Sequence, residues 1–235
     1  MNWTAKARPA TTGAASTATS RAAVPKPGPS VAPSPSGNTR ISNGLKEFLW
    51  LISDVPRARI LDLGPVWQST VSFFVEKGYR LSTDDLLRTW KEFLTTEEER
   101  LRLAPVGEGM ASTAMLAEKF LESALQYPEN HFHGVLAWDL LDYFDPAVMP
   151  PLMARLSKIL SPNGVVLALF HSRPVDRFHR YRITDAQTIE LVPAATLAVH
   201  AHVFQNREIL SLFSEFRSSK TFVGRDQVRE GLFLK

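Results

Sequence analysis

Acidic residues stand at the ends of three short apolar runs, where each carboxylate could bind a polar ligand. Asp62 closes one run, Asp84 follows the next, and Asp139 follows a third near the middle of the chain. A carboxylate has only hydrogen-bond acceptors and suits a pair of ribose hydroxyls. If the runs are parallel strands, their carboxyl ends meet at one edge of a sheet, where open α/β sheets bind ligands. Each aspartate could instead only cap the turn or helix that follows it.

The turn after Asp62 is the segment around which such a crevice would be built. A strand ends at Asp62-Leu63-Gly64 and the chain then enters a helix, and Gly64 lets the backbone approach a ligand closely. Val66 and Gln68 take the places where a nucleotide-binding turn usually has further glycines. We expect the branched side chain of Val66 to point toward the ligand. The turn favours a cofactor without phosphate groups over NAD or FAD, whose pyrophosphate needs the turn amides.

Histidines offer a second kind of chemistry. Two pairs lie at alternate positions, which share a face in a strand and could bind a metal ion: His131 and His133, and His200 and His202. No third ligand is spaced near either pair, so we predict no metal site. His171 follows the apolar strand 165–170 and could act as a general base or be an ordinary loop histidine. A basic cluster comes next and could hold an anionic acceptor or form a solvated face: Arg173, Arg177, His179, Arg180 and Arg182.

Composition narrows the classes of function. The chain of 235 residues has no cysteine, which excludes disulfides and thiol nucleophiles, and it has no apolar run of membrane-spanning length. Residues 1–40 contain five basic and no acidic residues, so residues 41–235 carry a net charge of −2 within a total of +3. This slightly acidic body does not favour nucleic-acid binding. Residues 1–40 are rich in Ala, Pro and Ser and are predicted to be a disordered tail. This tail could be a linker, in which case we expect a cytoplasmic protein, or an organellar targeting segment.

The periodicity of apolar residues predicts alternating helices and strands behind these polar positions. We expect helices at 42–54, from 69 or 70 to 78, at 86–94, from Thr96 onward, at 112–127, at 146–160 and from Asn206 onward. We expect strands at 57–63, 79–83, 134–138, 165–170, 220–223 and 231–234, with short alternating runs at 180–192 and 196–204. This order predicts a Rossmann-like, doubly wound, mostly parallel sheet with an antiparallel C-terminal strand pair. A helical insertion at about 85–127 would interrupt the domain 41–235 and could support a homodimer.

In order and spacing, these features resemble the class I S-adenosylmethionine-dependent methyltransferase family across residues 42–235. Four segments are similar to family motifs: Ile60–Gly64, Asp84 at 20 residues past Gly64, Val135–Tyr143, and Leu156–Phe170 with its Ser-Pro-Asn-Gly turn. The antiparallel C-terminal pair also resembles the family, whose last strand inserts antiparallel into the sheet.

The resemblance implies an S-adenosylmethionine cofactor and methyl transfer to a small-molecule or macromolecular acceptor. The residues that it implies at the cofactor are Asp62 and Gly64 near the methionine group, Asp84 (or its neighbour Asp85) at the ribose, and Trp138 and Asp139 beside the transferred methyl. Methyl transfer is largely a matter of positioning, so few catalytic side chains are needed. Asp139 and His171 are the candidates for a catalytic role.

Val66 and Gln68 replace glycines of the first motif, and this keeps a second hypothesis open. The chain would then be a non-catalytic methyltransferase-like module for binding or assembly that has lost cofactor binding. A third hypothesis is an enzyme that uses the crevice for another nucleoside-like ligand. An open cleft above Gly64 and Asp84 would favour an enzyme, whereas a cleft filled by residues 66–68 would favour the module.

Overall fold

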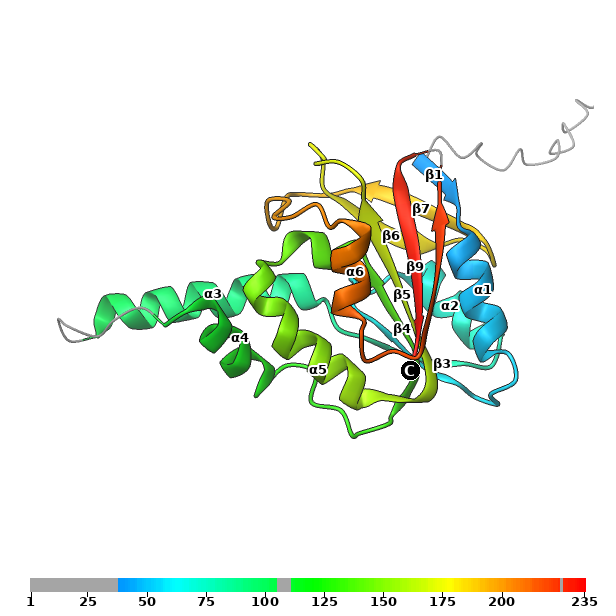
Figure 1. The fold of residues 1–235 in the computed structure, drawn as a ribbon, viewed down its shortest axis with the longest axis horizontal. Helices are drawn as coiled ribbons and strands as arrows, with labels where there is room; N and C mark the ends of the chain where they lie inside the picture. The colour runs from blue at the N-terminus through cyan, green and yellow to red at the C-terminus, as the bar shows by residue number, and fades with distance from the viewer. Residues whose placement is uncertain (1–37, 105–110, 225) are drawn as a thin grey trace, which may run out of the picture. The chain divides into compact units, whose positions relative to one another are not determined.

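A six-stranded sheet forms the centre of the protein. The computed structural model describes residues 38–104, 111–224 and 226–235, all within the second of two compact units, residues 35–235. The sheet has the strand order β3-β2-β4-β5-β9-β8 (Figure 1). Its strands are β2 (Arg59–Asp62), β3 (Arg80–Thr83), β4 (Phe132–Trp138), β5 (Leu160–His171), β8 (Ser218–Val223) and β9 (Val228–Leu234).

The strand directions confirm the predicted fold class. Strands β3, β2, β4 and β5 run parallel, whereas β9 runs antiparallel to both β5 and β8. The first strand of this sheet along the chain, β2, lies between β3 and β4, so the strand order reverses at the β2–β4 pair. Ligand crevices of open α/β sheets form outside the carboxyl ends of the strands at such a reversal.

Helices cover both faces of the sheet (Figure 1). On one face lie α1 (Asn43–Ile52) and α2 (Gln68–Glu76), and on the other lie α3 (Leu86–Leu103), α4 (Thr113–Leu121), α5 (Met149–Ile159) and α6 (Asn206–Leu212). Two 3-10 turns follow β4: η1 (Leu140–Tyr143) and η2 (Pro146–Val148). Alternate residues of β4 face the two layers, with Val135 and Ala137 toward α3–α6 and Leu136 and Trp138 toward α1 and α2. Both faces of the sheet are therefore buried, as is usual for parallel strands.

A separate antiparallel sheet, in the order β1-β7-β6, covers part of the α1 and α2 face. Its strands are β1 (Asn38–Ile41), β6 (His179–Ile183) and β7 (Thr188–Pro193). Tyr181 and Ile189 belong to the buried cluster that contains α1 and α2. The alternating run 180–192 contains most of β6 and β7. Strand β1 begins inside the predicted tail, whose residues 1–37 lie outside the described part. Three of the four residues of β1 are exposed and the buried one is Arg40, so no buried apolar residue marks this strand in the sequence.

Three other elements differ from the sequence prediction. A single helix, α3, replaces the two expected, because the hydroxyl of Thr96 donates to the carbonyl of Glu92 inside the helix and does not cap a new one. Helix α4 ends at Leu121, short of residue 127, and Leu125 beyond it has a positive φ of 53°. The run 196–204 forms no strand, although the structure describes all of it.

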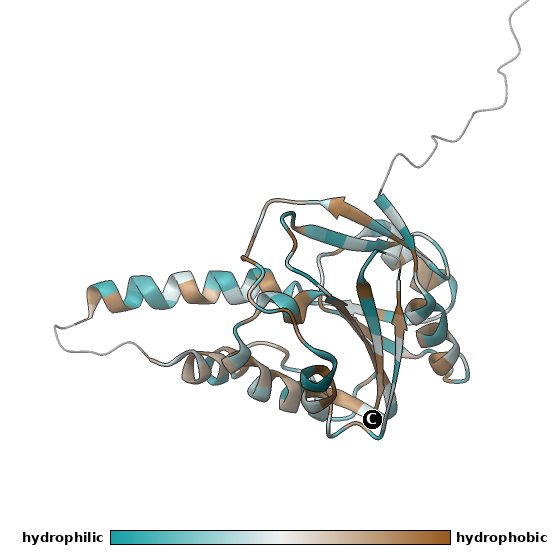
Figure 2. Ribbon diagram, turned by 45° about the horizontal axis from the view of Figure 1, so that its top comes forward, coloured by the Kyte–Doolittle hydropathy of each residue, from teal (hydrophilic) through white to brown (hydrophobic). Residues whose placement is uncertain are grey.

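None of the helices in the described part of the chain is long and apolar enough to cross a membrane. The 18-residue helix α3 alternates hydrophilic and hydrophobic residues along its length (Figure 2). Its first turns bury Leu86, Leu87 and Trp90, whereas Leu103 at its end is 89% exposed. Only the first half of α3 therefore contributes to the core.

Candidate functional site

Three of the residues predicted at the cofactor meet where the strand order reverses. Asp62 is the last residue of β2 and is buried. Its Oδ1 accepts hydrogen bonds from the backbone N–H of Gly64, at 2.9 Å, and from the indole Nε1 of Trp138, at 2.6 Å. A Cβ atom added at Gly64 would lie 3.1 Å from that indole nitrogen. Glycine at this position therefore allows the turn to pack closely against Trp138.

Trp138 ends β4 in an unusual backbone conformation. Its φ is +50°, a left-handed value that is rare for a bulky residue, and the β4–β5 register shifts between Leu136 and Trp138. The indole stacks on the ring of Tyr181 in β6, with centroids 5.5 Å apart and planes inclined by 9°. A non-glycine residue in this region costs about 1–3 kcal/mol and persists only when its surroundings hold it there. Asp62 and Tyr181 hold Trp138 from two sides.

Strand β6 lies against the crevice and supplies hydrogen-bond donors to two further carboxylates. The Tyr181 hydroxyl donates to Oδ2 of Asp139 over 2.8 Å. The guanidinium of Arg180 donates two hydrogen bonds to the carboxylate of Asp85, at 2.9 and 3.0 Å. The side chains of Arg180 and Asp85 are 13% and 9% exposed. Sequence reasoning did not place β6 in the site, and the basic cluster around Arg180 was its only signal.

Asp84, which the sequence favoured for ribose binding, lines a different cavity. This cavity of about 470 Å³ lies between α3 and α4 and includes Phe120 and Tyr127. Burial and the nearby charge of Asp85 raise the pKa of Asp84, against a hydrogen bond from the backbone of Leu125. A ribose role for Asp84 or Asp85 stays a prediction, and of the two it is the carboxylate of Asp85 that meets β6.

Little space remains in the crevice itself. Side chains of β4 and β6 and the turn at Gly64 enclose a cavity of about 20 Å³. This volume holds about one water molecule, whereas pockets for small molecules usually measure about 300–1,000 Å³. The side chains of Trp138, Arg180 and Tyr181 therefore keep the crevice closed.

The two replaced glycines do not fill the crevice. Val66 is 67% exposed, and the Gln68 amide donates to the hydroxyl of Ser72 on the first turns of α2. The chain leaves the sheet as an extended stretch before the α2 N-cap residue Trp67, which places Val66 at the surface. Contrary to the sequence prediction, Val66 does not point into the ligand space.

Burial changes the acid–base properties of two crevice carboxylates. Desolvation raises the pKa of Asp62 to about 6, although its hydrogen bonds favour the charged form. Desolvation also raises the pKa of Asp139 to about 6, against the lowering effects of the His171 charge and of a hydrogen bond. Carboxylates that titrate near neutrality in a crevice are typical of functional sites, although structural ion pairs produce them too.

The candidate base His171 ends β5 beside another aspartate. Its backbone N–H and its ring Nδ1 both approach Oδ2 of Asp142, at 2.7 and 3.1 Å. Burial lowers the pKa of His171, but the hydrogen bond to Asp142 and the charges of Asp139 and Asp142 raise it overall. His171 is therefore better suited to hold a proton than to take one at neutral pH.

Only one member of the two His-x-His pairs joins this cluster. His200 places Nε2 3.5 Å from Oδ2 of Asp142. His202 instead pairs with Glu208 at 3.1 Å, and Nδ1 of His133 accepts the backbone N–H of Arg59. The fold thus brings Asp142 and His171 to His200, which had no third ligand nearby in the sequence.

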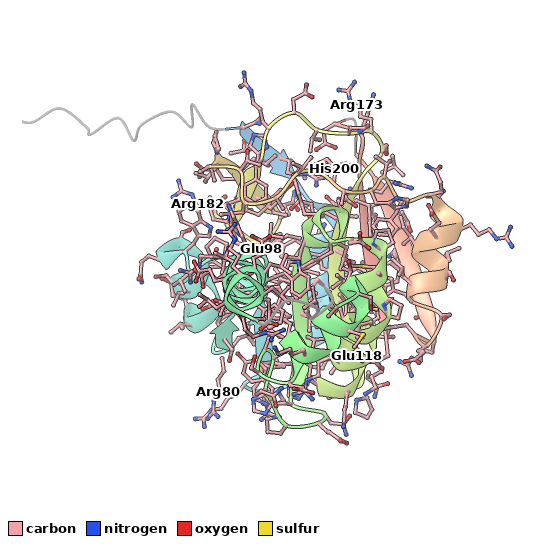
Figure 3. The ribbon with its side chains drawn as sticks, turned by 90° about the vertical axis from the view of Figure 1, so that its left-hand side faces the viewer. Arg80, Glu98, Glu118, Arg173, Arg182 and His200 are labelled. Atoms are coloured by element: carbon pink, nitrogen blue, oxygen red, sulfur yellow. The ribbon has the colours of Figure 1, made fainter. Side chains whose placement is uncertain are left out.

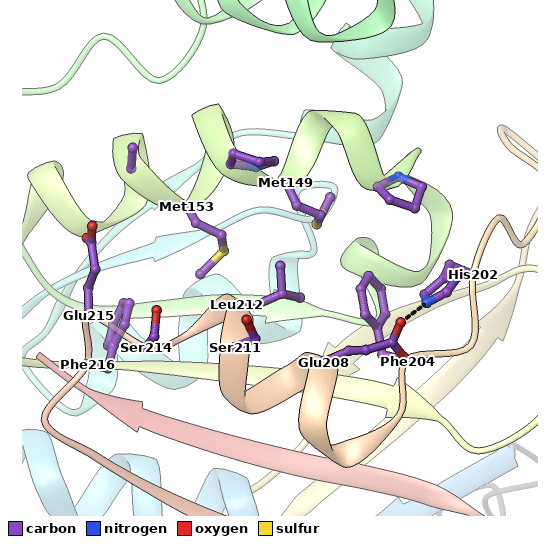
Figure 4. A pocket seen from close by; sticks show the side chains of 13 residues that line it. Met149, Met153, His202, Phe204, Glu208, Ser211, Leu212, Ser214, Glu215 and Phe216 are labelled. Carbon is purple, nitrogen blue, oxygen red and sulfur yellow. Dashed lines mark hydrogen bonds and ion pairs between the residues drawn. The ribbon is translucent and has the colours of Figure 1, made fainter.

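A larger groove lies between α5 and α6 (Figure 4). It has a volume of about 510 Å³, and its apolar lining includes Met149, Met153, Leu212 and Phe216. The His202–Glu208 pair lies along it. The groove contains none of the strand ends at which α/β sheets bind ligands. We therefore assign the chemistry to the crevice in spite of its smaller volume.

No protein-family model matches the chain, and no curated protein matches it. Among solved structures, the 1,6-didemethyltoxoflavin-N1-methyltransferase of Burkholderia thailandensis, with 1,6-didemethyltoxoflavin and S-adenosylhomocysteine bound, is 17% identical at a TM-score of 0.40, over 83% of this chain and 79% of that one. A SAM-dependent methyltransferase from Archaeoglobus fulgidus is 12% identical at a TM-score of 0.43, over 81% and 93%. The cyclase SpnF is 12% identical at a TM-score of 0.40, over 77% and 60%.

The sheet itself defines the fold. The parallel strands, the reversal at β2–β4 and the antiparallel insertion of β9 agree with the arrangement that the sequence motifs implied. By the order and direction of its strands, the chain has a class I methyltransferase-like fold.

Proposed function

We propose that the chain is an S-adenosylmethionine-dependent methyltransferase whose cofactor binds at the carboxyl ends of β2 and β4 once β6 moves aside. One observation carries this proposal: the buried Asp62 and Asp139 and the partly buried Asp85, whose side chain is 9% exposed, stand at the carboxyl ends of three neighbouring strands around the reversal point. S-adenosylmethionine supplies an electrophilic methyl group and offers a ribose diol and an ammonium group as donors. Acceptor-only carboxylates match those donors.

The contacts of β6 support the proposal because they resemble those of a nucleoside. Arg180 gives two N–H donors to Asp85, as a ribose diol would give two O–H donors. Tyr181 presents an aromatic ring to Trp138 and a hydroxyl to Asp139, as a base and a polar substituent would. Exchange of β6 for the cofactor would therefore leave no buried carboxylate without a donor.

The residues of the opened crevice would act mainly by positioning. Water exclusion and alignment of the acceptor with the methyl group supply most of the rate in such a transfer. Asp139, with a pKa of about 6, is mostly ionised at neutral pH and could take the proton of an acceptor hydroxyl or amine. The acceptor–methyl bond would form as the methyl–sulfur bond breaks, and S-adenosylhomocysteine would leave as the product.

A second function, a non-catalytic binding or assembly module, is favoured by a single observation. The crevice cavity of about 20 Å³ is too small for any nucleoside while β6 is in place. If β6 never leaves, its contacts are permanent core contacts and the fold serves only as a scaffold.

Calorimetric titration of the purified chain with S-adenosylmethionine and S-adenosylhomocysteine separates the two functions. Arg180→Gln removes the paired donors from Asp85, so the crevice should open more easily. Because a ligand binds weakly when its open state is rarely populated, the affinity for S-adenosylmethionine should then rise. Asp85→Asn should weaken binding about tenfold or more, because hydrogen bonds to a charged acceptor are worth about 1.5–3 kcal/mol.

Asp84→Asn is the matched control, because it makes the same change one residue away in a different cavity. It should leave affinity unchanged, and a loss confined to this variant would return the ribose role to Asp84. Absence of binding at millimolar ligand, in both the wild type and Arg180→Gln, would contradict methyl transfer and favour the module.

A further inference from the structure

We propose that Asp142, His171 and His200 form a binding site for one divalent transition-metal ion, of which zinc is the leading example. The three side chains come from η1, from the end of β5 and from the segment between β7 and α6. Their potential ligand atoms all lie within 4.8 Å of one another. The site does not depend on the proposed methyl transfer and would exist in a non-catalytic module as well.

The spacing of the ligand atoms suits a small metal ion. Oδ2 of Asp142 lies 3.1 Å from Nδ1 of His171 and 3.5 Å from Nε2 of His200. Zinc binds imidazole nitrogen and carboxylate oxygen at about 2.0–2.2 Å, so neighbouring ligands of a tetrahedral ion lie roughly 3.3–3.5 Å apart. The ligand atoms of the two histidines lie within 4.8 Å of each other, so closing around an ion would bring the two rings nearer together.

Backbone hydrogen bonds hold the three ligands together. The N–H of His171 donates to Oδ2 of Asp142 at 2.7 Å. The N–H groups of Ala201 and His202 donate to the Asp142 carbonyl at 2.8 and 3.2 Å, which fixes the segment that carries His200. The site is therefore preorganised: the contacts of the Asp142 carbonyl leave its carboxylate free for an ion, which would share Oδ2 with the N–H of His171.

Polar atoms of the site are buried without hydrogen-bond partners. Among the described residues, Oδ1 of Asp142, Nε2 of His200 and the hydroxyl of Tyr143 are buried with no hydrogen bond. The side chains of Asp142 and His200 are 0% and 5% exposed. Buried polar groups are almost always paired, and a cluster of unpaired ones calls for an explanation such as an ion. A cation would satisfy Nε2 of His200, and it would satisfy Oδ1 of Asp142 where both carboxylate oxygens coordinate it.

The donor set and the surrounding charge select the class of ion. Two imidazoles and one carboxylate suit zinc, iron or cobalt, whereas magnesium and calcium prefer oxygen ligands alone. Asp139 adds a second carboxylate, with Oδ2 3.8 Å from Nδ1 of His171. The charge of Arg40 also reaches His171, and Arg229 donates to its carbonyl. Arg40 is paired with acidic residues, so its positive charge is largely offset.

The site lies at the end of the sheet that carries the crevice. Figure 3 shows His200 toward the same end as Arg173, which follows β5, and away from Arg80, which begins β3. Asp139 borders the crevice and also approaches His171. An ion held here would lie next to Asp139 at the edge of the crevice.

Titration of the tag-free chain with Co²⁺ tests the site, because cobalt replaces zinc and its visible d–d absorption reports the coordination geometry. We expect one equivalent of Co²⁺ to bind and one equivalent of Zn²⁺ to displace it. His200→Gln should weaken Co²⁺ binding at least about tenfold, since even indirect partners of metal ligands change affinity by 10–100-fold. His202→Gln is the matched control, two residues away on the groove side, and should bind as the wild type does.

Equal affinity in His200→Gln and His202→Gln, or binding only at millimolar Co²⁺, would overturn the proposal. Asp142→Asn provides a second variant of nearly the same shape if His200→Gln fails to fold. X-ray absorption of the cobalt-loaded wild type requires no variant. Two imidazole ligands per cobalt would support the site, and an all-oxygen shell would contradict it.

Discussion

Trp138 is the residue on which the geometry of the crevice depends. Its left-handed backbone turns the indole toward Asp62 and Tyr181, and the bulge in β4 accommodates this turn. Backbone strain of this kind gathers at functional sites, where it keeps side chains in working positions. The positive φ of Trp138 therefore indicates that this residue shapes the crevice.

Asp62→Asn should remove a pH dependence of stability, since the folded pKa of Asp62 is about 6 against 3.8 for the free group. Between pH 3.8 and about 6, Asp62 keeps its proton in the folded state and loses it in the unfolded state. Its contribution to stability is therefore greatest below pH 3.8 and falls as pH rises through 6. Relative to the wild type, Asp62→Asn should gain up to about 3 kcal/mol between pH 4 and 7, at about 1.4 kcal/mol per pKa unit. Urea unfolding at a series of pH values measures this gain.

Asp185→Asn is a control, because the pH dependence of stability that Asp185 causes has the opposite sign. A backbone hydrogen bond from Gln187 lowers the pKa of the exposed Asp185, so this group stabilises the fold at neutral pH and loses that effect as pH falls. Asp185→Asn should therefore be destabilised most at neutral pH. An Asp62→Asn curve parallel to that of the wild type would show that Asp62 is not the titrating group.

At the scale of elements, helix α1 depends on a glycine in the strand beneath it. Phe48 is fully buried, and a Cβ added at Gly134 in β4 would clash with its Cζ. The ring occupies the space that a side chain at Gly134 would need. This close approach sets the distance between α1 and the sheet.

Gly134→Ala should therefore destabilise the fold by about 1–3 kcal/mol, the usual cost of overpacking a core. Phe48→Leu leaves a smaller side chain above the strand and should lower the additional cost of Gly134→Ala. Urea unfolding of the wild type, the two single variants and the double variant gives the coupling between the positions. Strictly additive losses would mean that Phe48 does not limit the space at Gly134.

The burial pattern of each helix and strand explains whether that element could be predicted from the sequence. Strands such as β4 and β5 are buried on both faces and show as apolar runs, and α1 shows the helical period. Strand β1 could not be found, because Arg40 is its one buried residue and its partner strand lies far along the chain. The break expected before Thr96 failed because a threonine can bond back within a helix as readily as it caps one.

The site was only partly predictable for related reasons. Asp62, Gly64 and Trp138 follow from motif positions, and the structure brings them into contact. Asp84 and Asp85 are adjacent and chemically identical, and only the path of the turn decides which of them meets β6. The proximity of His200 to Asp142 is tertiary and has no counterpart in local spacing.

At the scale of the whole molecule, Arg40 joins the two ends of the described chain. Its side chain is 6% exposed and pairs with Glu230 of β9 at 2.7 Å and with Asp226 at 3.1 Å. Glu230 is itself 2% exposed and accepts the N–H of Gly44 at the start of α1. One buried ion pair therefore connects β1, α1 and β9.

Arg40→Met should destabilise the fold by roughly 3–5 kcal/mol, because it leaves the buried Glu230 carboxylate without a cation. Arg40→Met/Glu230→Gln should recover much of this loss, since no unpaired charge remains and Gln can still accept from Gly44. Asp226→Asn, at a side chain that is 42% exposed, should cost less than about 1 kcal/mol. Thermal unfolding orders the three variants, and a double variant no more stable than Arg40→Met would contradict this account.

The pairing of β1 with β7 also has a consequence for synthesis of the chain. Ile41 lies opposite Thr188, so β1 leaves the ribosome about 150 residues before its partner. At 5–20 residues per second, β1 waits roughly 7–30 s as an unpaired strand. Its exposed residues are mostly polar, which protects such an edge from pairing with other chains. The sheet that carries β6 is thus completed late, when most of the central sheet has already been made.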